Sequence, residues 1–204
     1  MSNRQSIPGW DPIIYLYREW VRTPPRQGAV VVEVGVALGR SITWIADWCL
    51  ANNRRDIEVW AVDPWESSLP GNVRNGEQGT YAAQAGGDFS LYAKMLLEHD
   101  PEAYEFIRPI RAISARACKL FDPGSVDLCV IDGDHSYEGC DTDIQCLVPR
   151  LRDDGWIGGD DHHDTDWPGV VRACQETFGV GGYDVIKGMA TGWETGTVWL
   201  KRVT

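Results

Sequence analysis

Leu128-Cys-Val-Ile-Asp-Gly-Asp-His135 and Gly158-Gly-Asp-Asp-His-His163 are two segments in which an apolar run ends abruptly in carboxylates and imidazoles. Short apolar runs of this kind are typical of buried parallel strands. Ligands of open parallel sheets bind at the carboxyl ends of the strands. If the two strands are neighbours, their acidic ends meet at one edge of the sheet. Because like charges this close need a cation or a proton, the two segments predict either a divalent metal or acid–base chemistry.

Apolar runs and amphipathic repeats alternate along most of the chain. Strand-like runs lie at 29–34, 57–62, 106–110, 126–131 and 156–159, and helical spacings lie at 12–21, 41–50, 89–96, 115–120, 137–151 and 169–178. This alternation predicts an α/β fold with a mostly parallel sheet and helices on both faces. The last two strands, expected at 183–186 and 197–201 with a turn near Thr191-Gly192, lack a helix between them. One of them is therefore expected to be antiparallel, at the sheet edge.

The length of 204 residues predicts a single domain over 1–204, with an N-terminal helical region at 1–28. Segment 65–87 is rich in glycine and has no periodicity, which is typical of a functional loop, and we expect it to act as a lid. The amphipathic helix that follows is expected to stop before Pro101.

The composition excludes several classes of protein. A net charge of −11 argues against a nucleic-acid partner. Neither a signal peptide nor an apolar stretch long enough to span a bilayer is present, so no membrane partner is expected. The six cysteines include no Cys-x-x-Cys pair and several lie in apolar patterns, which suits a reducing cytoplasm. The sequence leaves the oligomeric state open, with a homo-oligomer as one alternative.

Glu33-Val-Gly-Val-Ala-Leu-Gly-Arg-Ser41 joins the first expected strand to its helix. Gly35 and Gly39 allow a tight turn and a close approach of the backbone to a ligand, and Ser41 is a plausible N-cap. A dinucleotide turn needs Gly-x-Gly-x-x-Gly, and Glu33 and Leu38 occupy two of the glycine positions. The carboxylate of Glu33 would repel a phosphate but could hold a cationic ligand. The turn therefore favours a ligand with an amine or a sulfonium.

Two further side chains are expected beside this turn. Asp63 ends the second strand, where a carboxylate can accept hydrogen bonds from both ribose hydroxyls of a nucleoside. Ser114 follows the third strand at the same edge, where its side chain or backbone could contact an adenine ring. A turn or helix cap is the alternative role for each of the two residues.

Asp132, Asp160 and Asp161 are the candidate metal ligands, because carboxylate oxygens suit Mg²⁺, Ca²⁺ or Mn²⁺. The alternative is that they are turn and cap residues. His135 is a candidate general base, although it could simply pair with Asp134. His162 and His163 could supply a ligand or a base, or cap the next helix.

Together these residues resemble the class I S-adenosylmethionine-dependent methyltransferases. The Glu33–Ser41 turn is similar to their first motif and Val62-Asp-Pro-Trp65 to their second. Ile131-Asp-Gly-Asp-His-Ser-Tyr-Glu138 and Gly158-Gly-Asp-Asp161 resemble small bacterial O-methyltransferases of the macrocin and sugar O-methyltransferase group, and the related cephalosporin-hydroxylase-type proteins. The resemblance covers about 30–173.

The resemblance implies a Rossmann-like three-layer sandwich whose seven-stranded sheet has the order 3-2-1-4-5-7-6, with the last strand antiparallel. It implies that S-adenosylmethionine is the cofactor, with Asp63 at its ribose and Ser114 near its adenine. The expected cofactor-binding set is Glu33, Gly35, Val36, Gly39, Ser41, Asp63, Pro64, Ser114 and Asp132. In the metal-dependent branch, the carboxylates matching Asp132, Asp160 and Asp161 hold Mg²⁺ or another divalent cation.

The leading hypothesis is a Mg²⁺-dependent O-methyltransferase that acts on a small hydroxylated metabolite, such as a sugar, a polyketide or a catechol-like molecule, with Asp132 or His135 as the catalytic base. One alternative is a metal-independent methyltransferase with His135 as base. Another is a binding module for S-adenosylmethionine that does not catalyse. A nicotinamide oxidoreductase is disfavoured by the missing glycines.

Overall fold

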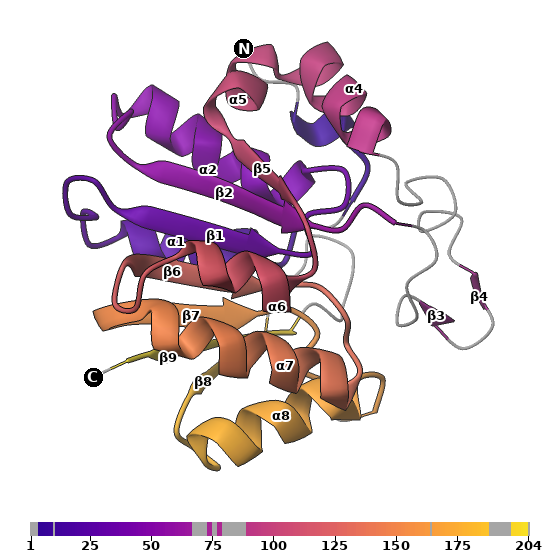
Figure 1. The fold of residues 1–204 in the computed structure, drawn as a ribbon. Helices are drawn as coiled ribbons and strands as arrows, with labels where there is room; N and C mark the ends of the chain where they lie inside the picture. The colour runs from indigo at the N-terminus through magenta and orange to yellow at the C-terminus, as the bar shows by residue number, and fades with distance from the viewer. Residues whose placement is uncertain are drawn as a thin grey trace.

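The computed structural model describes residues 4–9, 11–66, 73–74, 77–78, 89–163, 165–187 and 197–203. Its main feature is a seven-stranded sheet with the strand order β5-β2-β1-β6-β7-β9-β8 (Figure 1). The strands are β1 (Val30–Val34), β2 (Glu58–Asp63), β5 (Arg108–Arg111), β6 (Val126–Ile131), β7 (Leu151–Gly159), β8 (Asp184–Lys187) and β9 (Thr197–Arg202). Counted within this sheet, the order is the predicted 3-2-1-4-5-7-6.

The central strands are parallel, and β9 runs antiparallel to both of its neighbours, β7 and β8. The last strand is therefore antiparallel and lies inside the sheet, as the resemblance implied, whereas the strand pattern by itself placed an antiparallel strand at the edge. The edge is formed by β8, which runs in the same direction as β7. The predicted turn near Thr191 lies outside the described residues.

Helices cover both faces of the sheet (Figure 1). On one face lie α1 (Ile14–Val21), α2 (Arg40–Ala51), α4 (Phe89–His99) and α5 (Pro101–Phe106); on the other lie α6 (Ser114–Ala117), α7 (Tyr137–Leu147) and α8 (Pro168–Phe178). Successive residues of a strand face opposite sides, so Val31 packs in the core under α1 and α2 whereas Val32 packs in the core under α7 and α8. The predicted three-layer sandwich is confirmed.

Short 3₁₀ turns and one small hairpin complete the described chain. The turns are η1 (Arg4–Ser6), η2 (Cys118–Leu120) and η3 (Val148–Arg150), and the hairpin pairs β3 (Val73–Arg74) with β4 (Glu77–Gln78). Apart from Trp65, Glu66 and this hairpin, the expected lid at 65–87 lies outside the described residues. Within the part that the structure describes, no helix is long and apolar enough to cross a membrane.

The sequence missed one helix, α5. We expected the chain to leave α4 before Pro101 and to enter a strand near Phe106. Instead, Asp100 caps a new helix by accepting a hydrogen bond of 3.1 Å from the amide of Ala103. Pro101 occupies the first turn, where its missing N–H costs nothing. The proline thus starts a helix as well as ending one.

Candidate active site

The loops after β1, β2, β6 and β7 meet at the carboxyl edge of the sheet. Backbone hydrogen bonds continue past the strands there: the amide of Gly35 donates to Val62 at 2.9 Å, and that of Asp132 to Val34 at 2.8 Å. The amide of Asp160 donates to Ile131 at 3.1 Å. The glycine turn, Asp63 and the two acidic segments are therefore brought to one edge, as the sequence predicted.

The two glycines of the first turn are required by its geometry. Gly35 has a φ of +84°, and a Cβ at this position would overlap the carbonyl oxygen of Asp132. Gly39 has a φ of +91°, and its Cβ would collide with Leu96 of α4. Gly39 is also the N-cap of α2. The predicted N-cap role of Ser41 is therefore wrong, because Ser41 already lies inside the helix.

Beneath this turn lies a carboxylate, Glu33, that is fully buried. Its Oε1 accepts a hydrogen bond of 2.5 Å from Ser41, and its Oε2 accepts one from the hydroxyl of Tyr17. Burial raises the pKa of Glu33 to about 8, against the effect of the two hydroxyls, and the charges of Asp132 and Asp63 add to the rise. A nearby cation would favour the ionised form.

Asp63 joins the first turn to the second. Its Oδ2 accepts from the amide of Ala37 at 2.9 Å and its Oδ1 from the amide of Trp65 at 2.6 Å. Burial raises the pKa of Asp63, while these amides and that of Val36 oppose the rise. Each oxygen keeps a lone pair for a ligand hydroxyl. The carboxylate is thus held in place from behind.

Trp65 is a residue whose role the sequence missed. We expected it to begin the lid, but it is 2% exposed and packs against Phe89 and Tyr92 of α4. Its indole N–H donates to the carbonyl of Ala37 at 2.8 Å, so it ties together the same two turns as Asp63. Ala37 and Trp65 both have a positive φ, +48° and +45°. Such strain in residues other than glycine is common at functional sites.

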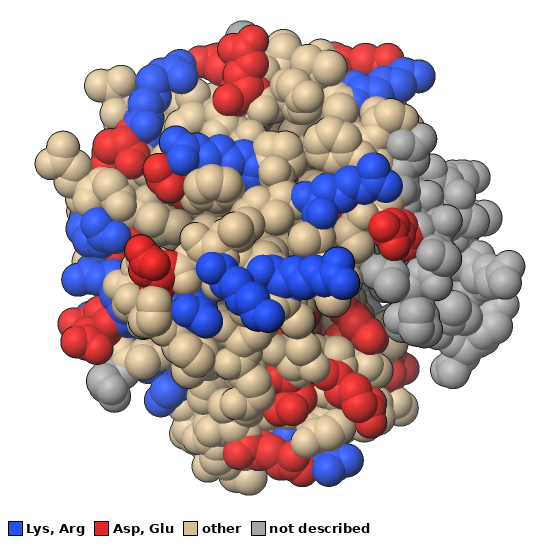
Figure 2. All heavy atoms as spheres, in the orientation of Figure 1, with Lys and Arg blue, Asp and Glu red and all other residues tan. Residues whose placement is uncertain are grey.

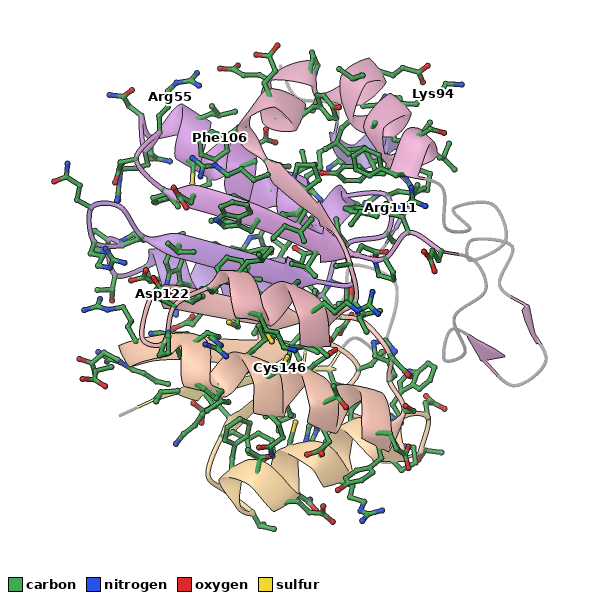
Figure 3. The ribbon with its side chains drawn as sticks, viewed as in Figure 1. Arg55, Lys94, Phe106, Arg111, Asp122 and Cys146 are labelled. Atoms are coloured by element: carbon green, nitrogen blue, oxygen red, sulfur yellow. The ribbon has the colours of Figure 1, made fainter. Side chains whose placement is uncertain are left out.

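A cavity of about 260 Å³ opens at Pro64, the residue after Asp63, between the loops after β2 and β5. Its lining residues are Pro64, Glu66, Arg111, Ala112, Ile113 and Arg116. Arg111 lies at the carboxyl end of β5 (Figure 3). A larger hollow of about 370 Å³, lined by Arg55 and Glu102 among others, contains none of the predicted residues. The smaller cavity is therefore the better candidate for a ligand.

Ser114 follows Ile113 of the cavity wall but does not itself line the cavity. It is buried, and its hydroxyl donates to Asp143 of α7. Asp143 is 5% exposed, and burial raises its pKa to about 6 despite the bond from Ser114. The sequence did not identify Asp143, because a single acidic residue inside an amphipathic helix carries no signal of its partner.

His135 lies between the acidic ends of β6 and β7. Its Nε2 is 3.3 Å from Oδ1 of Asp132 and its Nδ1 is 3.1 Å from Oδ2 of Asp161. The ring packs against that of Trp167 in a T-shaped pair, with 4.8 Å between the ring centroids. Burial would lower the pKa of His135, but the interaction with Asp132 and the charges of Asp161 and Asp160 raise it to about 9. The imidazole thus supplies a positive charge to this cluster.

Asp160 is the most deeply placed carboxylate of the cluster, at 8% exposure. Burial raises its pKa well above the usual range, and the charges of Asp132 and Asp161 add to the rise. Its Oδ1 accepts from the amide of Asp161 at 2.8 Å, and Asp161 has a φ of +56°. Even with His135 between them, these carboxylates repel one another.

The remaining candidates at this edge have structural partners. Nε2 of His162 is 2.8 Å from the hydroxyl of Tyr183, and Nδ1 of His163 accepts from the amides of Thr165 and Asp166 at 3.3 Å. Oδ1 of Asp134 accepts from the amide of Ser136 at 2.9 Å, in the turn before α7. Asp134 does not pair with His135, which the sequence had left as an alternative.

The three predicted metal ligands have suitable chemistry but not a suitable arrangement. Among the residues that the structure describes, no group of three or more His, Cys, Asp or Glu side chains is placed to hold a metal ion. The imidazole of His135 occupies the space between Asp132 and Asp161 that a bridging cation would need. The arrangement does not fit the expected Mg²⁺ site.

Comparison with known proteins identifies the family. The model of a methyltransferase domain matches residues 32–162, a range that includes the glycine turn after β1 and the acidic ends of β6 and β7. The chain belongs to this methyltransferase family. No functionally curated protein matches the sequence. This match confirms the assignment to the class I S-adenosylmethionine-dependent methyltransferases that we inferred from the motifs.

Solved structures confirm the methyltransferase fold. CalS11, a TDP-rhamnose 3′-O-methyltransferase of calicheamicin biosynthesis, is 16% identical with a TM-score of 0.57, over 91% of this chain and 75% of that one. The O-methyltransferase NovP is 17% identical with a TM-score of 0.55, over 94% and 78%. An rRNA methylase from Streptococcus thermophilus is 11% identical with a TM-score of 0.60, over 94% and 96%. Identities this low show a shared fold and nothing more specific.

Proposed function

We propose that this methyltransferase transfers the methyl group of S-adenosylmethionine to a hydroxyl of a small, uncharged or cationic metabolite, with His135 as the base. The observation that carries the proposal is the position of His135, whose ring lies between Asp132 and Asp161 at the edge that also carries the glycine turn. The proposal has two parts, a donor half at β1 and β2 and an acceptor half at β6 and β7.

The donor half binds the cofactor in this proposal. Gly35, Val36 and Gly39 let the backbone approach its methionine end, with Ser41 and Glu33 beneath them. Asp63 accepts hydrogen bonds from the ribose hydroxyls. This role is supported by the two backbone amides that hold its carboxylate in place. The adenine occupies the cavity beside Pro64 and contacts the backbone near Ser114, since the hydroxyl of Ser114 is bonded to Asp143.

The acceptor half prepares the nucleophile. The cofactor supplies a methyl group that its sulfonium already activates, so the protein has to position and deprotonate the acceptor. His135 acts as the base in its neutral form, which its pKa of about 9 makes the minor form near pH 7. In that form Nδ1–H donates to Asp161, and the free Nε2 takes the proton of the acceptor hydroxyl. Nε2 is buried and makes no hydrogen bond of good geometry within the described chain. Asp132 then stabilises the imidazolium that forms.

The metal requirement is where the structure changes the leading hypothesis. The carboxylates at β6 and β7 would attract Mg²⁺ by their chemistry, but His135 occupies the position between them. We therefore propose the metal-independent form, in which the imidazole neutralises the cluster. No step of the mechanism uses a metal.

Surface charge supports the acceptor class. Figure 2 shows acidic side chains over α7 and α8, beside the acceptor half, and basic ones over β5 and α6, beside the donor half. Exposed Glu138 and Glu176 belong to the acidic face, and Arg111 and Arg116 to the basic one. An anionic acceptor, including a nucleic acid, would meet repulsion at α7 and α8. Location is a separate part of the proposal. We place the protein in a reducing cytoplasm, and the six cysteines, all of them free, are consistent with that location.

A turnover assay tests the proposal. The chain is incubated with S-adenosylmethionine and a panel of sugars, polyketides and catechols, and mass spectrometry follows S-adenosylhomocysteine and methylated product. We expect a methyl ether from at least one neutral acceptor. Binding of S-adenosylmethionine without turnover on any acceptor would favour the non-catalytic binding module instead, and methylation confined to RNA would contradict the acceptor class.

A further inference from the structure

We propose that Tyr17 of α1 is a positioning residue of the donor half, because its hydroxyl and that of Ser41 hold the carboxylate of Glu33 in the orientation that receives the cationic methionine end of S-adenosylmethionine. The inference rests on the proposed function and assigns a role to α1, for which the sequence predicted only a helical region. Its basis is a set of contacts beneath the glycine turn.

The first contact is the one between Tyr17 and Glu33. Tyr17 is completely buried, and Ile13, Leu16 and Trp20, on the same side of the helix, lie in the same apolar core. A buried phenol hydroxyl needs a partner, and this one donates to Oε2 of Glu33. Packing alone would be served equally well by phenylalanine, so the hydroxyl has a use besides filling space.

The second contact fixes Glu33 from the opposite side. Ser41, in the first turn of α2, donates to Oε1 at 2.5 Å. The two hydroxyls engage both carboxylate oxygens, so the side chain has one orientation. Asp63 and Asp132 lie close enough on either side to raise the pKa of Glu33 by their charge. Three carboxylates on neighbouring strands thus surround the turn, and a cationic ligand is the group that relieves their repulsion.

A third set of contacts holds α1 in register with the turn. Arg40, next to Gly39, donates from Nε and Nη2 to the two oxygens of Asp11 at 2.9 and 3.0 Å. Its Nη1 donates to the carbonyl of Ile7 at 2.9 Å, and Arg4 donates to Asp11 at 2.7 Å. The chain that leads into α1 is therefore fastened to the first turn of α2. Tyr17 therefore lies on a helix whose entry is attached to the turn that follows Glu33.

A double-mutant cycle tests the proposal, with the affinity for S-adenosylmethionine measured by calorimetry. Tyr17→Phe removes only the hydroxyl and is expected to weaken binding about tenfold, the effect of one lost hydrogen bond to a charged group. In the Glu33→Gln background the same substitution is expected to change affinity less than about twofold, because Tyr17 acts through the carboxylate. Tyr137→Phe, which removes a hydroxyl that donates to Glu176 of α8 at 2.6 Å, is the matched control and should bind as the unaltered protein does.

Each outcome decides between the alternatives. If Tyr17 were merely structural, its substitution would weaken binding by the same factor in both backgrounds, and the proposal would be overturned. Affinity unchanged in Tyr17→Phe would overturn it as well. If Tyr17→Phe does not fold, Glu33→Gln alone carries the test, and full affinity in that variant contradicts the proposal. Failure of the unaltered chain to bind S-adenosylmethionine would instead refute the proposed function.

Discussion

The two halves of the carboxyl edge differ in how their carboxylates are satisfied. In the donor half, Asp63 accepts hydrogen bonds from two backbone amides, and Glu33 accepts hydrogen bonds from two hydroxyls. Each side chain is therefore fixed before a ligand arrives. In the acceptor half, Asp132, Asp160 and Asp161 crowd together, and one imidazole is the cation among them. Binding calls for preorganised groups, whereas proton transfer calls for perturbed ones. On this difference we propose that the donor half binds and the acceptor half reacts.

Gly35→Ala should break the connection between the halves most severely. The new Cβ overlaps the carbonyl of Asp132, and the positive φ adds strain, so we expect a loss of roughly 3 kcal/mol or more in the free energy of unfolding, with loss of cofactor binding. Gly124 is a matched control, because its φ is +71° but nothing lies within 4 Å of its Cβ. Gly124→Ala should cost about 1 kcal/mol. Denaturant titration compares the two, and equal losses would mean that the close approach to Asp132 has no importance.

His135→Asn should impair turnover in the acceptor half without impairing cofactor binding in the donor half. We expect kcat to fall about 100- to 10,000-fold, the usual contribution of a general base, while the affinity for S-adenosylmethionine stays within about twofold. In the unaltered enzyme kcat/KM should rise with pH up to about 9, where His135 loses its proton. Steady-state kinetics from pH 6 to 10 measure both effects. A profile that is flat over this range would exclude His135 as the base.

The same substitution, His135→Asn, should also change how the stability of the fold depends on pH. The pKa of His135 is about 9 in the folded chain against a usual 6.5. Its ion pairs therefore stabilise the fold fully below about pH 6.5, and this contribution disappears as the pH rises through 9. The stability difference between His135→Asn and the unaltered chain should accordingly be largest near pH 6 and vanish near pH 10. A difference that grew with pH would place the positive charge elsewhere.

Asp63→Ala should affect only the donor half. It removes the carboxylate that we propose for the ribose and leaves the amides of Ala37 and Trp65 without their acceptor. We expect the binding free energy of S-adenosylmethionine to fall by about 1–3 kcal/mol, with the pH profile of the remaining activity unchanged. Calorimetry and kinetics are the measurements. Unchanged affinity would refute the ribose assignment.

Asp143→Asn should have the smallest effect and tests the contact between Asp143 and Ser114, next to the cavity proposed for the adenine. The pKa of Asp143 is raised to about 6, so its ionisation opposes folding above that pH and costs nothing below about pH 4. Asparagine still accepts the bond from Ser114. We expect the variant to be at least as stable as the unaltered chain at pH 8, with this advantage lost by pH 4. Marked destabilisation at pH 8 would show that the charge of Asp143 is needed.

The fold was largely predictable because its signals are local. Apolar runs such as 126–131 and the alternation of strands with helices defined the parallel sheet, and the motif resemblance supplied its order. The errors arose where one residue has two uses. Pro101 can end one helix or begin the next, and Ser41 can cap a helix or, as found here, turn inward to a buried carboxylate.

The site was predictable in location but not in its interactions. Strand ends place Asp63, Asp132 and Asp160 at one edge whatever their partners are. The partners lie far away in the sequence, as Tyr17 does from Glu33 and Asp143 from Ser114, and no periodicity connects such pairs. The position of His135 between two carboxylates likewise depends on the turn before α7 and on Trp167. That position is what changed the interpretation of the acidic cluster from a metal site to a base.

Turnover in the presence of excess EDTA tests this central claim most directly. The assay uses the acceptor found to be methylated, at pH 8, with the chain freed of metal beforehand and with Mg²⁺ or Mn²⁺ added back in parallel. If His135 neutralises the acceptor half, activity should persist in EDTA and change less than about twofold when metal is restored. Loss of activity in EDTA with full recovery on adding Mg²⁺ would contradict the account.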